Sequence, residues 1–226
     1  ADKDMRSARF FPAALLSYGQ NILSGGDRQG ANEEAIIFRR EDGERRVVTW
    51  QQLAEDSLAL ATFLKGAGVG PQDRVAAWMP NVPETIVAMV ATSILGATFT
   101  STSPDFGVAG VLDRFGQVRP TVLIAADGYV YANRRHTRLD RLAEVVAGLP
   151  SLEAVIVHGE LDAQPGLGHV REGNPGLPIV TFEQAVEAGR RAAAGGVAID
   201  PDALYPFDHP LYILYSSGTT GVPKCI

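Results

Sequence analysis

The sequence predicts an α/β fold built on a doubly wound, mostly parallel sheet flanked by helices. Short apolar runs of strand length alternate with segments of helical periodicity along the middle of the chain, and the connections between them are short. Such alternation is typical of strand-helix-strand units with right-handed crossovers, which place ligands at the carboxyl ends of the strands. The chain has 226 residues, of which 46 % are hydrophobic and 20 % charged, enough apolar mass for one large core.

The N-terminal part of the chain predicts a short helix and a hairpin ahead of the alternating region. Residues 9–24 contain an aromatic pair, a proline and then an apolar periodicity that indicates a short amphipathic helix. Residues 35–39 and 46–48 are β-forming runs, and the turn-forming triplet Glu-Asp-Gly at 41–43 lies between them. A β-hairpin is therefore expected here.

A long helix is expected to follow the hairpin, with both of its ends marked. Thr49 and Gln52 have the spacing of a capping box, in which each side chain bonds the backbone N–H of the other residue. The apolar pattern then runs to Leu64, and Gly66 and Gly68 close the helix.

The alternating region gives the predicted sheet and its covering helices. We expect strands at residues 74–79, 97–101, 121–125 and 154–157, and helices at residues 83–95, 108–118 and 139–147. Residues 158–178 are rich in Gly and Pro and indicate an exposed loop before a helix at 182–194. The last strand is expected at residues 211–215.

Composition excludes several classes of protein. Lys and Arg total 20 against 26 Asp and Glu, and no long basic run is present, so a nucleic-acid partner is not expected. The uncharged run at residues 85–104 contains eight Ser or Thr and predicts a helix followed by a strand, not a membrane span. A single cysteine, Cys225, and an N-terminus without an apolar signal segment predict a cytoplasmic protein.

The most informative segment follows the last predicted strand directly. It holds four hydroxyl side chains, two glycines and a lysine within nine residues. Hydroxyl and backbone N–H donors, turns that glycine permits and one mobile cation suit a polyphosphate. The candidate phosphate-binding residues are Ser216, Ser217, Gly218, Thr219, Thr220, Gly221 and Lys224.

Two alternative interpretations of this segment are weaker. A Walker A loop ends in Gly-Lys-Ser/Thr, whereas Lys224 here follows Pro223 and precedes Cys225, so that motif is excluded. A flexible Ser/Thr/Gly turn explains any four of these residues. It does not explain ten consecutive positions that match one pattern, from Tyr215 to Lys224.

The ten residues YSSGTTGVPK resemble the phosphate-binding signature of the adenylate-forming superfamily, which contains acyl-CoA synthetases, adenylation domains and luciferases. The resemblance implies that this loop holds the β- and γ-phosphates of ATP while a carboxylate attacks the α-phosphate. It implies ATP, Mg²⁺ and CoA as cofactor or substrates, and the α/β fold predicted above. Segments at 48–53, 73–76 and 79–81 resemble packing elements of the same superfamily.

Other segments narrow the resemblance to one subfamily. Residues 103–107 with 111–115, residues 207–211 and residues 10–12 are similar to acetoacetyl-CoA synthetases rather than to acetyl-CoA synthetases. This implies activation of acetoacetate to an acyl-adenylate, with acetoacetyl-CoA, AMP and pyrophosphate as products. The alternatives are a CoA ligase for another short or medium-chain acid, or a non-catalytic nucleotide-binding module.

The resemblance also implies a division of the chain. We expect residues 1–30 to be a lead-in segment that docks on the core, and 31–226 to be part of a large N-terminal adenylation domain truncated just after the phosphate loop. The catalytic groups, the magnesium ligand and the acyl pocket are then expected after Ile226, and residues 1–226 alone are expected to be inactive.

Weaker candidates remain outside the loop. Arg134 and Arg135 lie where related acetyl-CoA synthetases have a Gly-rich basic stretch that meets the nucleotide end of CoA. The glycines of that stretch are replaced here, and solvated surface arginines are the favoured interpretation. The four histidines have no metal-ligand spacing, and His209 is expected to shape a turn. Cys225 has no neighbouring base, so a nucleophilic role is not expected. Asp105 is expected to cap a helix or to lie at the surface.

Overall fold

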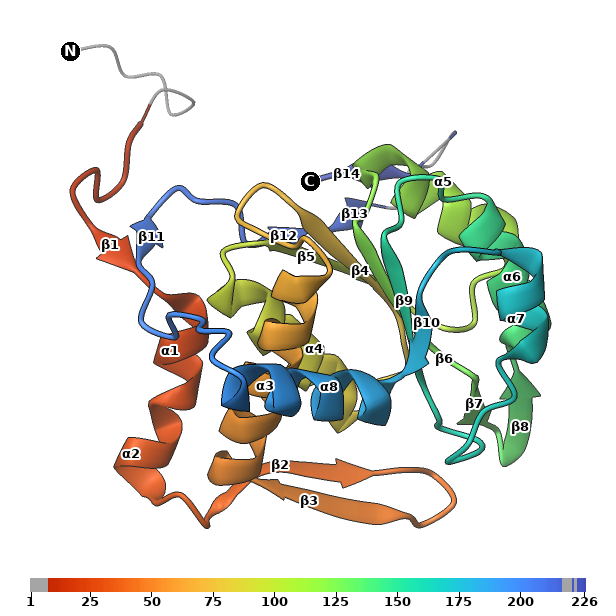
Figure 1. Cartoon of the computed structure of the whole chain (residues 1–226), viewed down its shortest axis with the longest axis horizontal. Coiled ribbons are helices and arrows are strands. Elements are labelled where there is room, and N and C mark those ends of the chain that lie inside the picture. The colour runs from red at the N-terminus through yellow and green to blue at the C-terminus, as the bar shows by residue number, and fades with distance from the viewer. Residues whose placement is uncertain (1–7, 217–220, 222) are drawn as a thin grey trace.

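The computed structural model describes residues 8–216, 221 and 223–226, and its centre is a six-stranded parallel sheet with helices on both faces (Figure 1). Every pair of neighbouring strands in this sheet is parallel. In spatial order the strands are β10 (Ile179–Thr181), β9 (Ala154–His158), β6 (Val122–Ala126), β4 (Arg74–Trp78), β5 (Thr98–Thr102) and β12 (Tyr212–Ile213). This architecture confirms the predicted fold class.

Alternate residues of each central strand supply two separate cores. In β4, Val75 and Ala77 belong to one cluster of buried side chains, whereas Ala76 and Trp78 belong to the other. Because successive side chains of a strand point to opposite faces, a strand buried on both faces is apolar throughout. The first face is covered by α3 (Trp50–Gly66), α4 (Pro83–Ile94) and α8 (Phe182–Ala194), and the second by α5 (Val108–Val118), α6 (Leu139–Ala147) and α7 (Gly168–Gly173).

Four two-stranded sheets lie around this body, and one of them, formed by the last two strands, is described below. The other three are β1 (Leu15–Leu16) with β11 (Tyr205–Pro206), β2 (Glu34–Arg39) with β3 (Arg45–Thr49), and β7 (Gly128–Tyr131) with β8 (Arg134–Thr137).

The β2–β3 hairpin was predicted, and so was the capping box that follows it. The Thr49 hydroxyl accepts from Gln52 N at 3.2 Å, and Gln52 Oε1 accepts from Thr49 N at 2.9 Å.

The N-terminal segment differs from its prediction. In place of one helix it forms α1 (Tyr18–Leu23) and α2 (Gly25–Gln29) after β1. A Cβ on Gly25 would lie 2.4 Å from the Trp50 ring, and one on Gly19 would lie 2.7 Å from Ile94 Cγ1. Both glycines therefore permit close approach, which packs this segment against α3 and α4.

The region after β6 contains elements that the sequence did not predict. The β7–β8 hairpin occupies residues 128–137, β10 precedes α8, and α7 lies within the predicted loop 158–178. Leu167 and Val170 are buried in the second core and anchor α7, which explains a helix in a segment rich in Gly and Pro. The N-cap of α5 is Gly107 without a side-chain cap bond, so the capping role of Asp105 is wrong and its surface position holds.

The last predicted strand is divided between two sheets. β12 pairs with β5 at the edge of the main sheet, and β13 (Tyr215–Ser216) then turns away to pair with β14 (Lys224–Cys225). Among the residues that the structure describes, no helix is both long enough and apolar enough to cross a membrane.

Candidate functional site

The strand order places a topological switch point at β4. The chain moves from β4 to β5 on one side and then returns to β6 on the other side. In open parallel sheets, ligands bind outside the carboxyl ends of the strands at such a point. β12 lies beside β5 and leads directly into β13 at the carboxyl ends of the strands.

A short antiparallel hairpin closes the base of the predicted phosphate loop. Ser216 pairs with Lys224 and Tyr215 with Cys225, and the backbones of Leu214 and Ile226 exchange two hydrogen bonds of 3.0 and 2.9 Å. The register therefore places two candidate phosphate ligands, Ser216 and Lys224, directly opposite each other at the neck of the loop. Side chains at such paired positions share one face of a hairpin.

The remaining loop candidates are only partly visible. Gly221 has φ of +105°, a conformation that glycine adopts without strain. Ser217, Gly218, Thr219 and Thr220 lie outside the described residues.

The N-terminal limb of the hairpin is tied to the main sheet through Tyr215. Its hydroxyl is hydrogen-bonded to Thr100 Oγ1 at 2.9 Å, and the same Thr100 oxygen lies 2.8 Å from the Ile213 carbonyl oxygen. The Tyr215 ring packs near Phe115, with ring centroids 6.4 Å apart, and the Arg114 guanidinium lies 5.9 Å from its centroid. Burial raises the pKa of Tyr215, so its hydroxyl stays protonated at neutral pH.

The two CoA candidates lie on the β7–β8 hairpin, away from β13 and β14 (Figure 1). Arg134 pairs with Tyr131, and Arg135 pairs with Val130. Consecutive strand residues point to opposite faces, so the two arginines cannot meet one ligand group side by side. The Arg135 guanidinium donates to the Leu161 carbonyl, whereas Arg134 is exposed next to Tyr131, which is 66 % exposed.

The segment that Arg135 contacts is itself fixed by a buried carboxylate. Asp127, directly after β6, accepts from the backbone N–H groups of Leu161 and Asp162 at 2.9 Å each. Arg138 is buried nearby and donates to the Pro104 carbonyl at 2.7 Å. Arg135 and these neighbours therefore hold the hairpin to the body, and of the two candidates Arg134 is the one left to meet a ligand.

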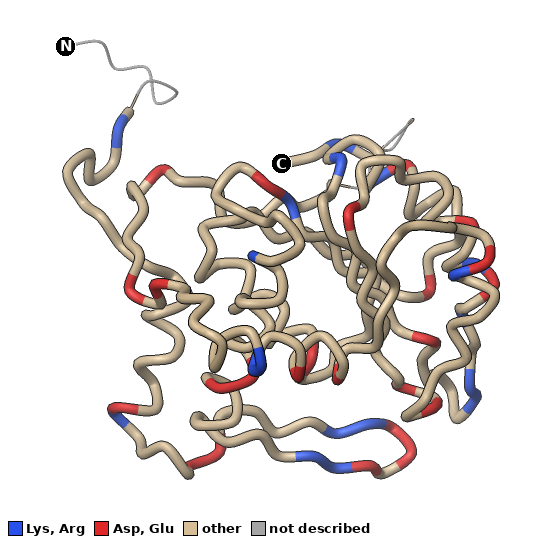
Figure 2. The backbone as a smooth tube through the Cα atoms, viewed as in Figure 1, with Lys and Arg blue, Asp and Glu red and all other residues tan. Residues whose placement is uncertain are grey.

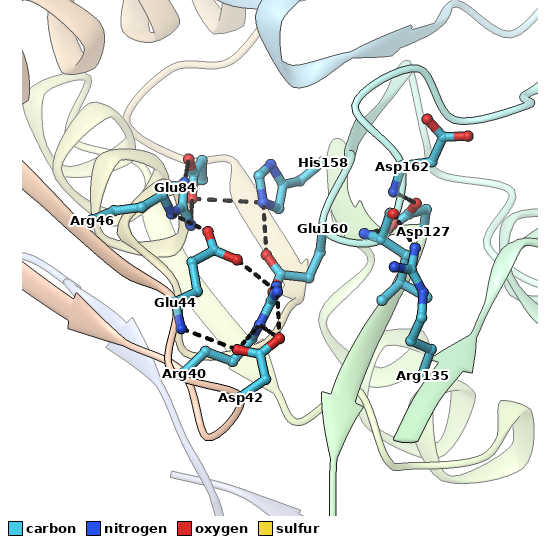
Figure 3. Close-up of polar contacts among 11 residues, drawn as sticks. Arg40, Asp42, Glu44, Arg46, Glu84, Asp127, Arg135, His158, Glu160 and Asp162 are labelled. Atoms are coloured by element: carbon cyan, nitrogen blue, oxygen red, sulfur yellow. Dashed lines mark hydrogen bonds and ion pairs between the residues drawn. The ribbon is translucent and has the colours of Figure 1, made fainter. Parts of the chain in front are cut away.

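A cluster of charged side chains lies at the carboxyl end of β9 (Figure 3). We call it the carboxyl-edge cluster, and it consists of Arg40, Glu44, Arg46, Glu84, His158 and Glu160. Arg46 makes a bidentate contact with Glu84 at 2.7 and 3.2 Å, and His158 Nε2 lies 3.4 Å from Glu160 and 3.6 Å from Glu84.

The electrostatics of this cluster favour a structural role. Hydrogen bonding to Asp42, with help from Glu160, raises the pKa of Arg40 despite partial burial. Burial works to raise the pKa of Glu160, but hydrogen bonds and charge from His158 and Arg40 outweigh it and lower that pKa. A carboxylate held ionised by an arginine is a poor general acid, so the cluster serves to tie the β2–β3 hairpin to the sheet.

His209 occupies the turn that the sequence predicted for it. The backbone N–H of His209 donates to the Pro206 carbonyl at 2.9 Å, its Nε2 lies 2.6 Å from the Gly96 carbonyl, and its ring stacks on Tyr205, which confirms that it shapes this turn. Within the described part of the chain, no three His, Cys, Asp or Glu side chains gather as metal ligands. Figure 2 shows acidic and basic residues interspersed, without a continuous basic face over the described residues.

Comparison with known proteins identifies the family. Residues 26–226 match the family model described as AMP-binding enzyme. The chain belongs to the AMP-binding enzyme family. This confirms the resemblance seen in the YSSGTTGVPK segment, whose residues lie within the matched range.

Individual relatives show which members of the family the chain is similar to. It is 43 % identical over 222 residues to the acetoacetyl-coenzyme A synthetase of Rhizobium meliloti, covering 98 % of this chain and 32 % of that protein. It is 37 % identical over 219 residues to the malonamoyl-CoA synthetase vrtB of Penicillium aethiopicum, covering 96 % of this chain and 30 % of that protein.

A solved structure of an acetoacetyl-CoA synthetase from Streptomyces lividans matches with a TM-score of 0.84 and 37 % identity, covering 100 % of this chain and 32 % of that one. The structural match confirms the fold of this member of the AMP-binding enzyme family. The chain spans about a third of the length of these relatives.

Proposed function

We propose that the protein carrying this chain is an ATP-dependent acetoacetate–CoA ligase. The proposal is supported by the family match and by relatives named acetoacetyl-CoA synthetase at up to 43 % identity. The observation that carries it is the YSSGTTGVPK loop, which emerges from the β13–β14 neck beside the carboxyl end of β12. Acetoacetate, ATP and CoA are the proposed substrates.

The proposed reaction has two steps. A carboxylate oxygen of acetoacetate attacks the α-phosphorus of ATP, the bond to the β-phosphate breaks, and pyrophosphate leaves. The CoA thiol then attacks the acyl carbon, AMP departs, and the thiol proton is released. The first step brings two anions together, so cations and oriented donors on the polyphosphate lower the barrier.

The phosphate loop supplies such donors in this proposal. We assign the β- and γ-phosphates of ATP to Ser216, Ser217, Gly218, Thr219, Thr220, Gly221 and Lys224. Lys224 acts as a point charge on a flexible stem, which can follow a phosphate group as it leaves. Its place opposite Ser216 supports joint contact of a hydroxyl and an ammonium group with one phosphate.

Magnesium enters this proposal together with ATP. Mg²⁺ usually binds through one or two carboxylates together with the phosphates of a nucleotide. The roles assigned to the loop residues do not depend on the ion.

The proposed contact with CoA uses Arg134, with Arg135 in a supporting role. Exposed Arg134 beside exposed Tyr131 offers a cation and an aromatic face, which suit the phosphate and purine of a nucleotide. Arg135 supports this contact by holding the hairpin to Leu161.

We also propose a division of the chain and a compartment. Residues 1–30 are the proposed lead-in segment, whose helices α1 and α2 pack on α3 and α4. Residues 31–226 are proposed to contribute to the adenylation domain, and the 226 residues alone to be inactive. The cytoplasm is the proposed compartment, because the single cysteine, Cys225, is exposed as a free thiol.

Pyrophosphate exchange tests the function directly. The full natural polypeptide is assayed with ATP and acetoacetate, acetate, butyrate, 3-hydroxybutyrate or malonamate as the acid. The proposal expects the highest rate with acetoacetate. A higher rate with another acid would assign the enzyme to that acid instead. Malonamate is included because one relative is named malonamoyl-CoA synthetase. ATP binding without exchange for any acid would indicate a non-catalytic nucleotide-binding module.

A further inference from the structure

Helix α5 supports the hairpin that closes the phosphate loop (Figure 1). Val111, Phe115 and Val118 bury one side of α5 in the second core, and this side fixes the helix on the sheet. Gln117 lies between two of these anchors but is exposed, on the side that meets β14. A side chain on so firmly packed a helix is a fixed reference point for the β13–β14 hairpin.

Gln117 contacts the residues on both sides of Lys224. Its Nε2 donates to the Pro223 carbonyl at 2.9 Å, and its Oε1 accepts from Cys225 Sγ at 3.5 Å. The same Nε2 also donates to the Asp113 carbonyl one turn earlier on α5, which orients the amide. These partners are 106 and 108 positions away in sequence, so only the folded chain brings them together.

We propose that Gln117 is a positioning residue that holds the C-terminal limb of the loop so that the Lys224 ammonium meets the polyphosphate of ATP. This inference rests on the proposed function. Pro223 has no backbone N–H to donate across the hairpin, and its carbonyl accepts a hydrogen bond from the Gln117 amide. An amide is suited to this place because it donates and accepts at once without a charge that would repel phosphate.

The N-terminal limb of the hairpin is held by a separate hydrogen bond. Tyr215 is held by Thr100 on β5 of the main sheet, whereas Gln117 holds the opposite limb from α5. With both limbs tied, less conformational freedom is lost when ATP binds, which favours affinity. Removing the Gln117 tie should therefore weaken nucleotide binding and leave the acid site unaffected.

The test compares Gln117→Met and Gln117→Glu with the wild type in the full natural polypeptide. Methionine keeps the length of the side chain without the amide, and glutamate keeps an acceptor for Cys225 but loses the donor to Pro223. The readouts are the dissociation constant for MgATP by calorimetry, and KM for ATP and for the acid in pyrophosphate exchange. We expect both variants to bind MgATP about five- to twentyfold more weakly, the loss typical of one or two neutral hydrogen bonds, with KM for the acid unchanged.

Asp113→Ala is the matched control. Asp113 is exposed on the same helix one turn earlier and offers Gln117 only its backbone carbonyl, which alanine retains. We expect wild-type MgATP affinity from this variant.

The outcomes separate this inference from the proposed function. The role of Gln117 would be overturned if Gln117→Met bound MgATP as tightly as the wild type. It would also be overturned if Asp113→Ala lost as much MgATP affinity as the Gln117 variants, or if KM for the acid rose in those variants as much as the dissociation constant for MgATP. If the wild type exchanges pyrophosphate with none of the acids, the proposed function fails, while the calorimetric comparison of MgATP still decides on Gln117. A wild type that does not bind MgATP overturns both.

Discussion

Arg40 and Glu160 stand 120 positions apart in the chain, yet Arg40 Nη1 lies 2.6 Å from Glu160 Oε1. Their side chains are 19 % and 5 % exposed, so the pair is largely withdrawn from solvent. It ties the tip of the β2–β3 hairpin to the segment after β9 (Figure 3). Removing one partner of such a pair leaves the other charge poorly solvated, which destabilises the fold more than loss of an exposed pair.

The first prediction concerns the pH dependence of this tie. The pKa of Glu160 in the folded protein lies below its ordinary value of 4.5. Its carboxylate therefore contributes stability that is present above pH 4.5 and is lost as the pH falls through the lower folded pKa. We expect Glu160→Gln to reduce the free energy of unfolding by about 1–3 kcal/mol at pH 5, and the difference from wild type to shrink toward pH 3.

Urea denaturation at several pH values between 5 and 3 measures this difference. The control is Glu34→Gln, which breaks the Arg45–Glu34 pair of the same hairpin, where the side chains are 44 % and 50 % exposed. We expect the control to cost less than about 1 kcal/mol. A difference for Glu160→Gln that grows as the pH falls would contradict the assignment.

A second prediction uses the two capping boxes. In α8, Thr181 accepts from Gln184 N at 3.2 Å, as Thr49 does from Gln52 N in α3. We expect Thr49→Ala and Thr181→Ala each to lower the free energy of unfolding by about 1 kcal/mol, because a backbone N–H at the helix start loses its acceptor. Denaturant titration checks this, and Thr→Ser at either position should retain most of the stability. Equal losses for Ser and Ala would show that the methyl group, not the hydroxyl, is responsible.

A third prediction concerns the contact between α3 and α8. A Cβ on Gly189 would lie 1.8 Å from the Ala59 carbonyl oxygen, a backbone atom that cannot move without shifting α3. Gly189→Ala should therefore destabilise the protein by about 3 kcal/mol or more. At Gly66, the last residue of α3, a Cβ meets nothing within 4 Å, and Gly66→Ala should be neutral or stabilising by up to about 1 kcal/mol. Similar thermal midpoints for the two variants would refute the packing argument.

Sequence patterns predicted the central sheet well because its strands are buried on both faces. β4, β6 and β9 are therefore continuous apolar runs bounded by polar turns. β10 was missed because it has only three residues and runs directly into the capping box of α8. The β7–β8 hairpin was missed because Ala132 and Asn133 form its turn with φ of +52° and +58°, without the glycine that marks such turns.

The candidate site was predictable from the sequence only where its residues lie together in one short segment. The segment proposed to bind phosphate could be singled out because its residues are consecutive. The pairing of Ser216 with Lys224 could not, because it depends on two-residue strands that have no pattern of their own. Arg40, Glu84 and Glu160 meet only through the fold, and no spacing in the sequence links them. Gln117 was missed for the same reason, since its partners lie more than 100 positions away.

The last prediction separates the two arginines proposed to contact CoA. The double variant that carries both Arg134→Ala and Arg135→Ala should raise KM for CoA in the complete reaction. It should leave acid-dependent pyrophosphate exchange unchanged, because adenylate formation does not use CoA. The single variants should differ, since Arg134 is exposed beside Tyr131 and Arg135 donates to the Leu161 carbonyl. Arg134→Ala should account for most of the rise in KM, about tenfold for loss of one charge-assisted hydrogen bond, while Arg135→Ala should mainly lower the thermal midpoint. Steady-state kinetics with varied CoA measures the change in KM, and thermal unfolding of each variant measures the change in the thermal midpoint. Unchanged CoA kinetics in the double variant would leave these arginines with a surface role alone.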